Sequence, residues 1–193
     1  MIRKFLLIIM IFSFFSTSSA NYHQLAYNFS FKGLNGKQIS LKDYNNKVIV
    51  IVNVASRCGY TPQYKDLQDL WTKYNKELVV IGVPTNNFKQ EPENNAAIKE
   101  FCETNFGITF PMSEKVDVIG SNAHPFFKWA KENHGKSAIP KWNFHKIIIG
   151  KEGKVVDTFA SFTSRLLKNF LILLIKRLKV KEKTIISRYD IFW

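Results

Sequence analysis

Residues 47–70 read KVIVIVNVASRCGYTPQYKDLQDL. The first eight of these residues are mostly β-branched, and a nearly continuous apolar run of this kind, with Asn53 as its one interruption after Lys47, is typical of a strand buried on both faces of a sheet. Thr61 and Pro62 then open a helical pattern, with Thr61 as the expected N-cap and Pro62 at the first helical position. A buried strand followed directly by a helix indicates an α/β fold.

The rest of the chain extends this strand–helix order in both directions. Large apolar residues recur at helical spacing after Pro62 and belong to the core: Tyr64, Leu67, Leu70, Trp71 and Tyr74. We expect a further strand over 78–83, helices over 93–105, 121–134 and 165–179, and hairpins formed by 29–31 with 38–41 and by 146–150 with 154–159. This order predicts a central mixed β-sheet flanked by helices, with an N-terminal β-hairpin.

The first twenty residues are predicted to be a signal peptide. Arg3 and Lys4 precede an apolar run over 5–15 that is interrupted only by Ser13, and small residues lead up to Ala20, after which cleavage is expected. The apolar run is shorter than the roughly 20 residues that span a bilayer. An uncleaved membrane anchor is the alternative, and in either case we expect the folded domain to lie outside the cytosol.

The 193 residues suffice for one domain with a real core and are too few for two of ordinary size. We assign that domain to residues 21–164 and treat 165–193 as a divergent basic tail. The net charge of +13 divides into +2 for the leader, +6 for the tail and +5 for the domain. The sequence has no basic stripe with a nucleic-acid motif, no cluster with metal-ligand spacing and no phosphate-binding loop.

The tail has an amphipathic pattern over 165–179, with basic residues on one face and apolar residues on the remainder. Two roles are open for this predicted helix: covering the sheet, or lying on an anionic membrane surface. A third explanation of this segment is a shifted reading frame that replaced the native end of the chain.

Only two cysteines occur, Cys58 and Cys102. In an exported protein such a pair is either a structural disulfide or a catalytic pair. Cys58 follows the buried strand and precedes a helix N-terminus, where partial positive charge and free N–H groups favour the thiolate over the thiol. A thiolate is the nucleophile that attacks a peroxide oxygen, so this placement suits a catalytic cysteine. Position alone does not decide between that role and a structural cysteine.

Three separate segments resemble the signatures of the glutathione peroxidase family. They are NVASRCGYT at 53–61, GVPTNNFKQEP at 82–92 and WNF at 142–144. The resemblance runs from about residue 27 to 164, and the segments stand in the family's order. Lys89 departs from the pattern, because many members have glycine there. The resemblance implies a thioredoxin-like fold, hydroperoxides as substrates and no bound cofactor or metal.

The resemblance also implies a four-residue site made of Cys58, Gln90, Trp142 and Asn143. Two amides and an indole N–H are neutral donors, which hold an anionic sulfur and stabilise charge on a leaving oxygen without neutralising the thiolate. Trp142 and Asn143 are adjacent in sequence, so both reach the site only if the backbone there is not a regular strand. Without the resemblance, Gln90 reads as a surface amide and Trp142 as a core indole.

The segment FCETNF at 101–106 resembles the resolving-cysteine region of the family's cysteine-type, thioredoxin-dependent members. This implies that Cys58 becomes a sulfenic acid, that Cys102 condenses with it to a disulfide, and that thioredoxin or glutathione reduces that bond. A disulfide needs Cα atoms within about 7 Å, so we expect the helix around Cys102 to unwind locally. The alternative is that Cys102 is only a small buried helix residue.

Two other functions are weighed against the thiol peroxidase. A thiol-disulfide oxidoreductase normally needs C-x-x-C, and the second cysteine is missing from 58–61. A membrane-associated stress-response binding protein would use both cysteines as a structural disulfide. The short segment between Phe127 and Trp142 resembles family members without an oligomerisation loop, which favours a monomer.

Overall fold

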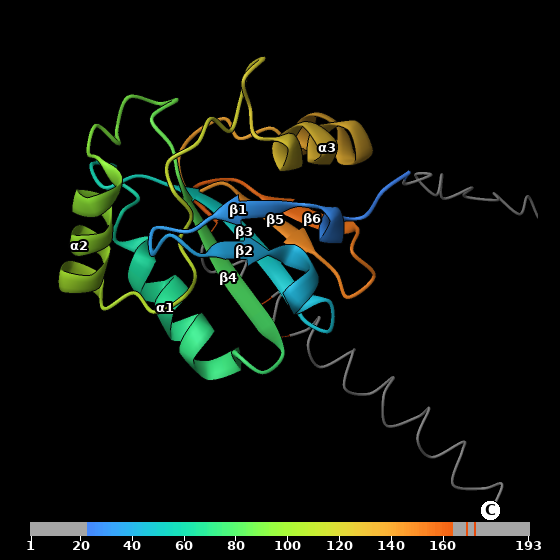
Figure 1. Cartoon of the computed structure of the whole chain (residues 1–193), viewed down its shortest axis with the longest axis horizontal. Helices are drawn as coiled ribbons and strands as arrows, with labels where there is room; N and C mark the ends of the chain where they lie inside the picture. The colour runs from blue at the N-terminus through green and yellow to red at the C-terminus, as the bar shows by residue number, and fades with distance from the viewer. Residues whose placement is uncertain (1–22, 164–168, 170–171, 173–193) are drawn as a thin grey trace, which may run out of the picture.

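A mixed four-stranded sheet forms the centre of the molecule, for which a computed structural model describes residues 23–163, 169 and 172. The strand order is β4-β3-β5-β6 (Figure 1). The strands are β3 Val48–Val54, β4 Leu78–Pro84, β5 Lys146–Ile149 and β6 Val155–Phe159. β3 and β4 run parallel, while β5 is antiparallel to both β3 and β6. The predicted mixed sheet is confirmed.

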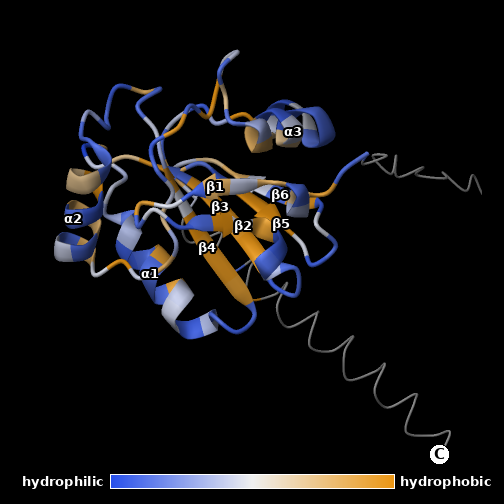
Figure 2. Ribbon diagram, viewed as in Figure 1, coloured by the Kyte–Doolittle hydropathy of each residue, from blue (hydrophilic) through white to orange (hydrophobic). Residues whose placement is uncertain are grey.

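One face of this sheet is covered by two helices, α1 (Gln63–Tyr74) and α2 (Asn95–Phe106). Val50 and Val52 of β3 share an apolar cluster with residues of both helices. All seven residues of β3 are buried, because both faces of the sheet are covered. Figure 2 shows β3 and β4 in the hydrophobic colour, with α1 and α2 beside them in mixed, largely hydrophilic colours.

The opposite face is covered by α3 (Pro125–His134) and by the predicted N-terminal hairpin. The hairpin consists of β1 (Ser30–Lys32) and β2 (Gln38–Ser40), which pair antiparallel. Three short 3-10 helices complete the description: Ala26–Asn28, Leu41–Tyr44 and Gly135–Ala138. The layers therefore form the helix–sheet–helix sandwich that the sequence predicts.

The helix starts differ from the predictions in detail. α1 begins at Gln63 with Pro62 as its N-cap, so the prediction of Thr61 as N-cap is wrong. α2 begins at Asn95, two residues later than predicted, because the side chain of Asn94 caps it by accepting a hydrogen bond from Ala97 N at 2.9 Å.

α3 begins at Pro125, four residues later than predicted. The ring nitrogen Nδ1 of His124 accepts a hydrogen bond from Phe126 N at 3.3 Å and so caps the helix. Pro125 suits the first helical position because its missing N–H would have no partner there.

The predicted signal peptide at 1–20 lies outside the described residues. So does the predicted helix over 165–179, apart from positions 169 and 172, which are helical. Within the described part of the chain, no helix is both long and apolar enough to cross a membrane.

Candidate active site

The three signature segments meet at one edge of the sheet. Val54 pairs with Pro84 at the carboxyl ends of the parallel strands β3 and β4. β5 runs antiparallel to β3, and Lys146 at its start pairs with Val52, so its amino end lies at the same edge. The segments that leave the sheet here are residues 55–61, 85–92 and 142–145. The topology therefore brings together residues that are distant in sequence.

Cys58 lies in a turn between β3 and α1, and 7% of its surface is exposed. Its sulfur accepts a hydrogen bond from Tyr60 N at 3.4 Å. The Thr61 hydroxyl accepts from Cys58 N at 3.1 Å and donates to Ala55 O at 2.9 Å. This use of the hydroxyl explains why Thr61 does not cap α1: it closes the turn that holds the sulfur.

Gln90 is joined to this turn through its backbone and to Asn143 through its side chain. Arg57 N donates to Gln90 O at 3.0 Å, and Asn143 Nδ2 donates to Gln90 Oε1 at 2.9 Å. Lys89 has a φ of 57°, in the left-handed region that glycine adopts most readily. Lys89 therefore adopts a backbone conformation that suits glycine, the residue that the resemblance led us to expect at this position.

Trp142 and Asn143 lie in a turn before β5, so the requirement for an irregular backbone is met. Asn53 fixes this turn on both sides: its Nδ2 donates to Trp142 O at 3.1 Å, and its carbonyl accepts from Phe144 N at 2.6 Å. The Trp142 side chain is 41% exposed and packs at a ring-centroid distance of 5.5 Å from Phe88. Trp142 is therefore not a core indole.

The two amides of the predicted site, Gln90 and Asn143, keep N–H groups that are not used in their mutual hydrogen bond. Because Gln90 Oε1 accepts from Asn143, the amide nitrogen of Gln90 is the end left for donation, and Asn143 Nδ2 carries a second hydrogen. Within the described residues, the hydrogen bond to the Cys58 sulfur comes from Tyr60 rather than from these side chains. Direct stabilisation of the sulfur by Gln90, Trp142 and Asn143 stays a prediction.

Cys102 lies within α2 and is 1% exposed. It belongs to the same apolar cluster as Cys58, and both cysteines are free thiols. Burial raises the pKa of Cys102 to about 11, an effect that the neighbouring Tyr64 phenol offsets only in part. Cys102 is thus held as a neutral thiol in an intact helix, and the resolving role stays a prediction.

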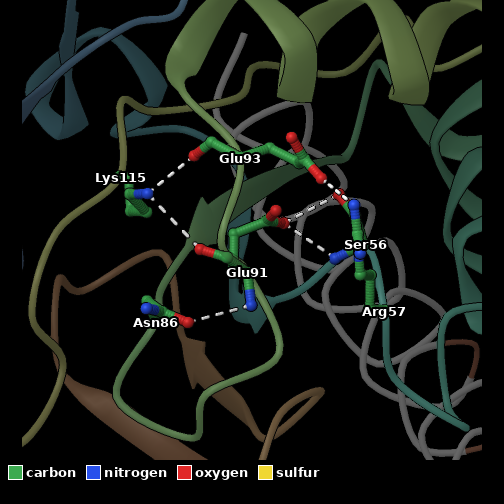
Figure 3. A network of polar contacts seen from close by, with 6 residues as sticks. All are labelled: Ser56, Arg57, Asn86, Glu91, Glu93 and Lys115. Carbon is green, nitrogen blue, oxygen red and sulfur yellow. Dashed lines mark hydrogen bonds and ion pairs between the residues drawn. The ribbon is translucent and has the colours of Figure 1, made fainter.

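A buried carboxylate behind the Cys58 turn was not singled out from the sequence. Glu91 is fully buried, and its Oε2 accepts from Ser56 N at 2.7 Å and from Ser56 Oγ at 2.8 Å (Figure 3). Burial raises the pKa of Glu91. The signal in the sequence was an acidic residue between Gln90 and Pro92, which lies inside the second signature segment.

Two ionisable groups at the start of β5 are also buried. Burial lowers the pKa of His145 to about 4, so its imidazole is neutral at pH 7. Burial lowers the pKa of Lys146 to about 8, and its Nζ donates to Gln63 Oε1 at 2.6 Å. Among the described residues, no group of three or more His, Cys, Asp or Glu side chains is placed to hold a metal ion.

Comparison with known proteins identifies the family of this chain. The model of the glutathione peroxidase family matches residues 26–131. The chain belongs to the glutathione peroxidase family. It is 44% identical over 155 residues to hydroperoxy fatty acid reductase gpx1 of Synechocystis sp., covering 75% of this chain and 90% of that protein.

Two further relatives support the assignment. Glutathione peroxidase-like peroxiredoxin 2 of Saccharomyces cerevisiae is 44% identical over 142 residues, covering 71% of this chain and 88% of the yeast protein. The crystal structure of T. cruzi GPX1 superimposes with a TM-score of 0.62 at 30% identity, covering 79% of this chain and 97% of that one. The chain therefore has the predicted thioredoxin-like fold and is a peroxidase of the oxidoreductase class, with hydroperoxides as substrates and thiols as reductants.

Proposed function

We propose that Cys58 is the attacking thiolate of this peroxidase and that Gln90, Trp142 and Asn143 stabilise the charge that develops on the departing oxygen. The observation that carries this proposal is the joining of three signature segments at one edge of the sheet. Arg57 N connects the Cys58 turn to the backbone of Gln90, and the Gln90 side chain is bonded to Asn143.

The first step is an attack by the Cys58 thiolate on one oxygen of the hydroperoxide. The O–O bond breaks as the S–O bond forms, which gives a sulfenic acid on Cys58 and an alkoxide or hydroxide. The proton that the thiol lost on ionising balances the alcohol or water that leaves. Neutral N–H donors stabilise the developing oxyanion, and one such donor typically contributes about 10²–10³ in rate.

The second step is a condensation of Cys102 with the sulfenic acid, which forms the Cys58–Cys102 disulfide and releases water. α2 must open locally for this step, because Cys102 is buried within an intact helix. An external dithiol of the thioredoxin type, or two molecules of glutathione, then reduces the disulfide to two thiols and is itself oxidised.

For the substrate we propose hydrogen peroxide together with organic and lipid hydroperoxides. The name of the Synechocystis relative, hydroperoxy fatty acid reductase, makes a fatty acid hydroperoxide the first organic substrate to test. We further propose that the domain is exported through the signal peptide at 1–20 and acts as a monomer, with peripheral membrane contact through the tail at 165–193.

Single-turnover kinetics with three proteins test the proposed roles. In wild type, one equivalent of hydroperoxide should be consumed rapidly and a dithiol should sustain turnover. Cys58→Ser should remove the reaction altogether. Cys102→Ser should retain the first turnover at the wild-type rate but lose thioredoxin-driven cycling. Undiminished cycling by Cys102→Ser would refute the resolving role, and peroxide consumption by Cys58→Ser would refute the whole scheme.

The disulfide oxidoreductase alternative is disfavoured by Thr61. This residue occupies the position of the second cysteine in C-x-x-C, and its hydroxyl holds the turn closed through Ala55 and Cys58.

A further inference from the structure

Glu91 lies directly after Gln90 in the loop that follows β4, and none of its surface is exposed. One carboxylate oxygen, Oε2, accepts both hydrogen bonds that Ser56 donates, from the backbone N–H and from the hydroxyl. Ser56 stands two residues before Cys58. The carboxylate therefore fixes the start of the Cys58 turn by two short contacts.

The backbone around Glu91 is fixed as well. Asn86 Oδ1 accepts from Glu91 N at 3.1 Å, while Lys115 Nζ donates to Glu91 O at 3.3 Å and to Glu93 O at 2.6 Å (Figure 3). Arg57 forms an ion pair with Glu93 outside this buried layer. Figure 3 shows Glu91 between Ser56 and the side chains of Asn86 and Lys115. These contacts fix the backbone of the loop independently of its contact with the Cys58 turn.

A buried carboxylate is costly to hold, and this one is incompletely satisfied. Its second oxygen, Oε1, has no hydrogen-bond partner among the described residues. The Lys115 ammonium acts on the carboxylate by its charge, while its hydrogen bonds go to backbone carbonyls. Within the described part of the chain, the hydrogen bonds that the carboxylate accepts come from Ser56 alone, which directs its contribution to the Cys58 turn.

We propose that Glu91 is a positioning residue of the peroxidase site, whose buried carboxylate holds Ser56 so that Cys58 and Gln90 keep their relative placement. Arg57, which lies between Ser56 and Cys58, donates its backbone N–H to Gln90 O. Asn143 is linked to the same loop, because its Nδ2 donates to Gln90 Oε1. Loss of the Ser56 contacts would free the turn to move away from the donors. A displacement of about 1 Å at a reacting centre lowers a rate by as much as 10²-fold.

This inference rests on the proposed function, so that function is tested first. All proteins carry Cys102→Ser, and the protein with Cys58 intact, called wild type here, is compared with the one that also carries Cys58→Ser. If the two consume hydrogen peroxide equally, the proposed function has failed and the role of Glu91 is refuted with it. If wild type alone reacts, the rate constants of Glu91→Ala and Glu91→Gln with hydrogen peroxide are measured next. The matched control is Glu93→Gln, which changes a neighbouring carboxylate that does not contact Ser56.

Each variant is also alkylated with iodoacetamide, which reports on the Cys58 thiolate without needing the donors in place. We expect Glu91→Ala to react with peroxide roughly 10- to 100-fold more slowly, with alkylation within about threefold of wild type. Glu91→Gln retains an oxygen that accepts both Ser56 bonds and should keep most of the peroxide rate. Glu93→Gln should be unchanged in both assays.

Ser56→Ala supplies a second, milder test should Glu91→Ala fail to fold. It removes the hydroxyl contact and keeps the N–H contact, so we expect a several-fold slower peroxide reaction with unaltered alkylation. In the double variant with Glu91→Ala the two losses should combine to less than their product, because both act through one contact. An unchanged peroxide rate in Glu91→Ala or in Ser56→Ala, multiplicative losses, or an equal fall in alkylation would overturn the proposal.

Discussion

Cys58 and Cys102 contribute to the same apolar cluster, yet their immediate surroundings differ in kind. Cys58 lies in an irregular turn at the edge of the sheet, where the backbone N–H of Tyr60 donates to its sulfur. Cys102 lies inside α2, where helical bonding uses the backbone N–H groups and apolar side chains surround the thiol. Burial of a similar degree therefore leaves the Cys58 sulfur beside a backbone N–H donor, whereas the Cys102 sulfur has the Tyr64 phenol as its neighbour.

The difference shows how one fold can give two buried thiols different tendencies to ionise. Irregular backbone leaves N–H groups unpaired, and these groups stabilise an anion. A thiol in a helix interior finds no such groups, so burial keeps it protonated, as the pKa of about 11 for Cys102 indicates. Under the proposed mechanism, Cys102 reacts only after α2 opens beside an oxidised Cys58, which protects it from direct attack by peroxide.

The largest expected contrast between the two thiols is in their rates of alkylation. With a pKa of about 11, Cys102 is only roughly one part in 10⁴ thiolate at pH 7. Cys102 also lies within an intact helix, whereas Cys58 lies in an irregular turn. We expect iodoacetamide to label Cys58 at least about tenfold faster than Cys102 in the reduced native protein, measured by mass spectrometry of the two peptides.

Labelling in concentrated urea is the control, because unfolding should bring the two rates together. Native rates within tenfold of each other would mean that α2 opens often enough to remove the contrast.

The stability of the protein at alkaline pH tests the raised pKa of Cys102. The unfolded thiol ionises near pH 9, whereas the native thiol keeps its proton up to about pH 11. Above pH 9 the native state therefore binds more protons than the unfolded state, so the free energy of unfolding falls as the pH rises. Two pH units correspond to about 3 kcal/mol lost by pH 11.

Cys102→Ser removes this titration, so the stability difference between wild type and variant should shrink by that amount between pH 9 and 11 in urea unfolding. Tyr27 and Tyr44 also have pKa values raised by burial, and comparing the two proteins cancels their shared contribution. The pKa of Tyr64 is raised by burial and by Cys102 itself, so the change that the variant makes at Tyr64 is part of the measured difference. A difference that stays constant across this range would show that the native thiol ionises as easily as the unfolded one.

The comparison also shows where sequence reasoning succeeds. Strand β3 was predicted from its nearly continuous β-branched run. A strand buried on both faces has apolar residues at almost every position, and this pattern is visible in the sequence. The turn before β5 was required by the adjacency of Trp142 and Asn143, and it is present. These features depend on residues that are neighbours in sequence, so periodicity and motif order suffice to predict them.

Features that depend on contacts across the fold were not predictable in this way. Thr61 reads as an N-cap, but the closeness of Ala55 O and Cys58 N gives its hydroxyl another use. Glu91 reads as an ordinary charged loop residue, and its burial follows only from the packing of the β4 loop against Ser56. For Thr61, hydrogen bonds within its own turn outweigh the preference for capping, and for Glu91 a tertiary contact with Ser56 outweighs the preference for solvent.

The smallest expected effect concerns the turn itself and tests whether its backbone geometry distinguishes Cys58 from Cys102. Thr61→Val keeps the shape of the buried side chain but leaves Ala55 O and Cys58 N without their partner. We expect a loss of about 1–3 kcal/mol in the free energy of unfolding, together with slower peroxide reduction and unchanged labelling of Cys102. Thr61→Ser retains the hydroxyl and should stay close to wild type in the peroxide assay. If the valine and serine variants reduce peroxide equally well, the hydroxyl is not what holds the sulfur in its reactive position, and the contrast between the cysteines must arise from the helix alone.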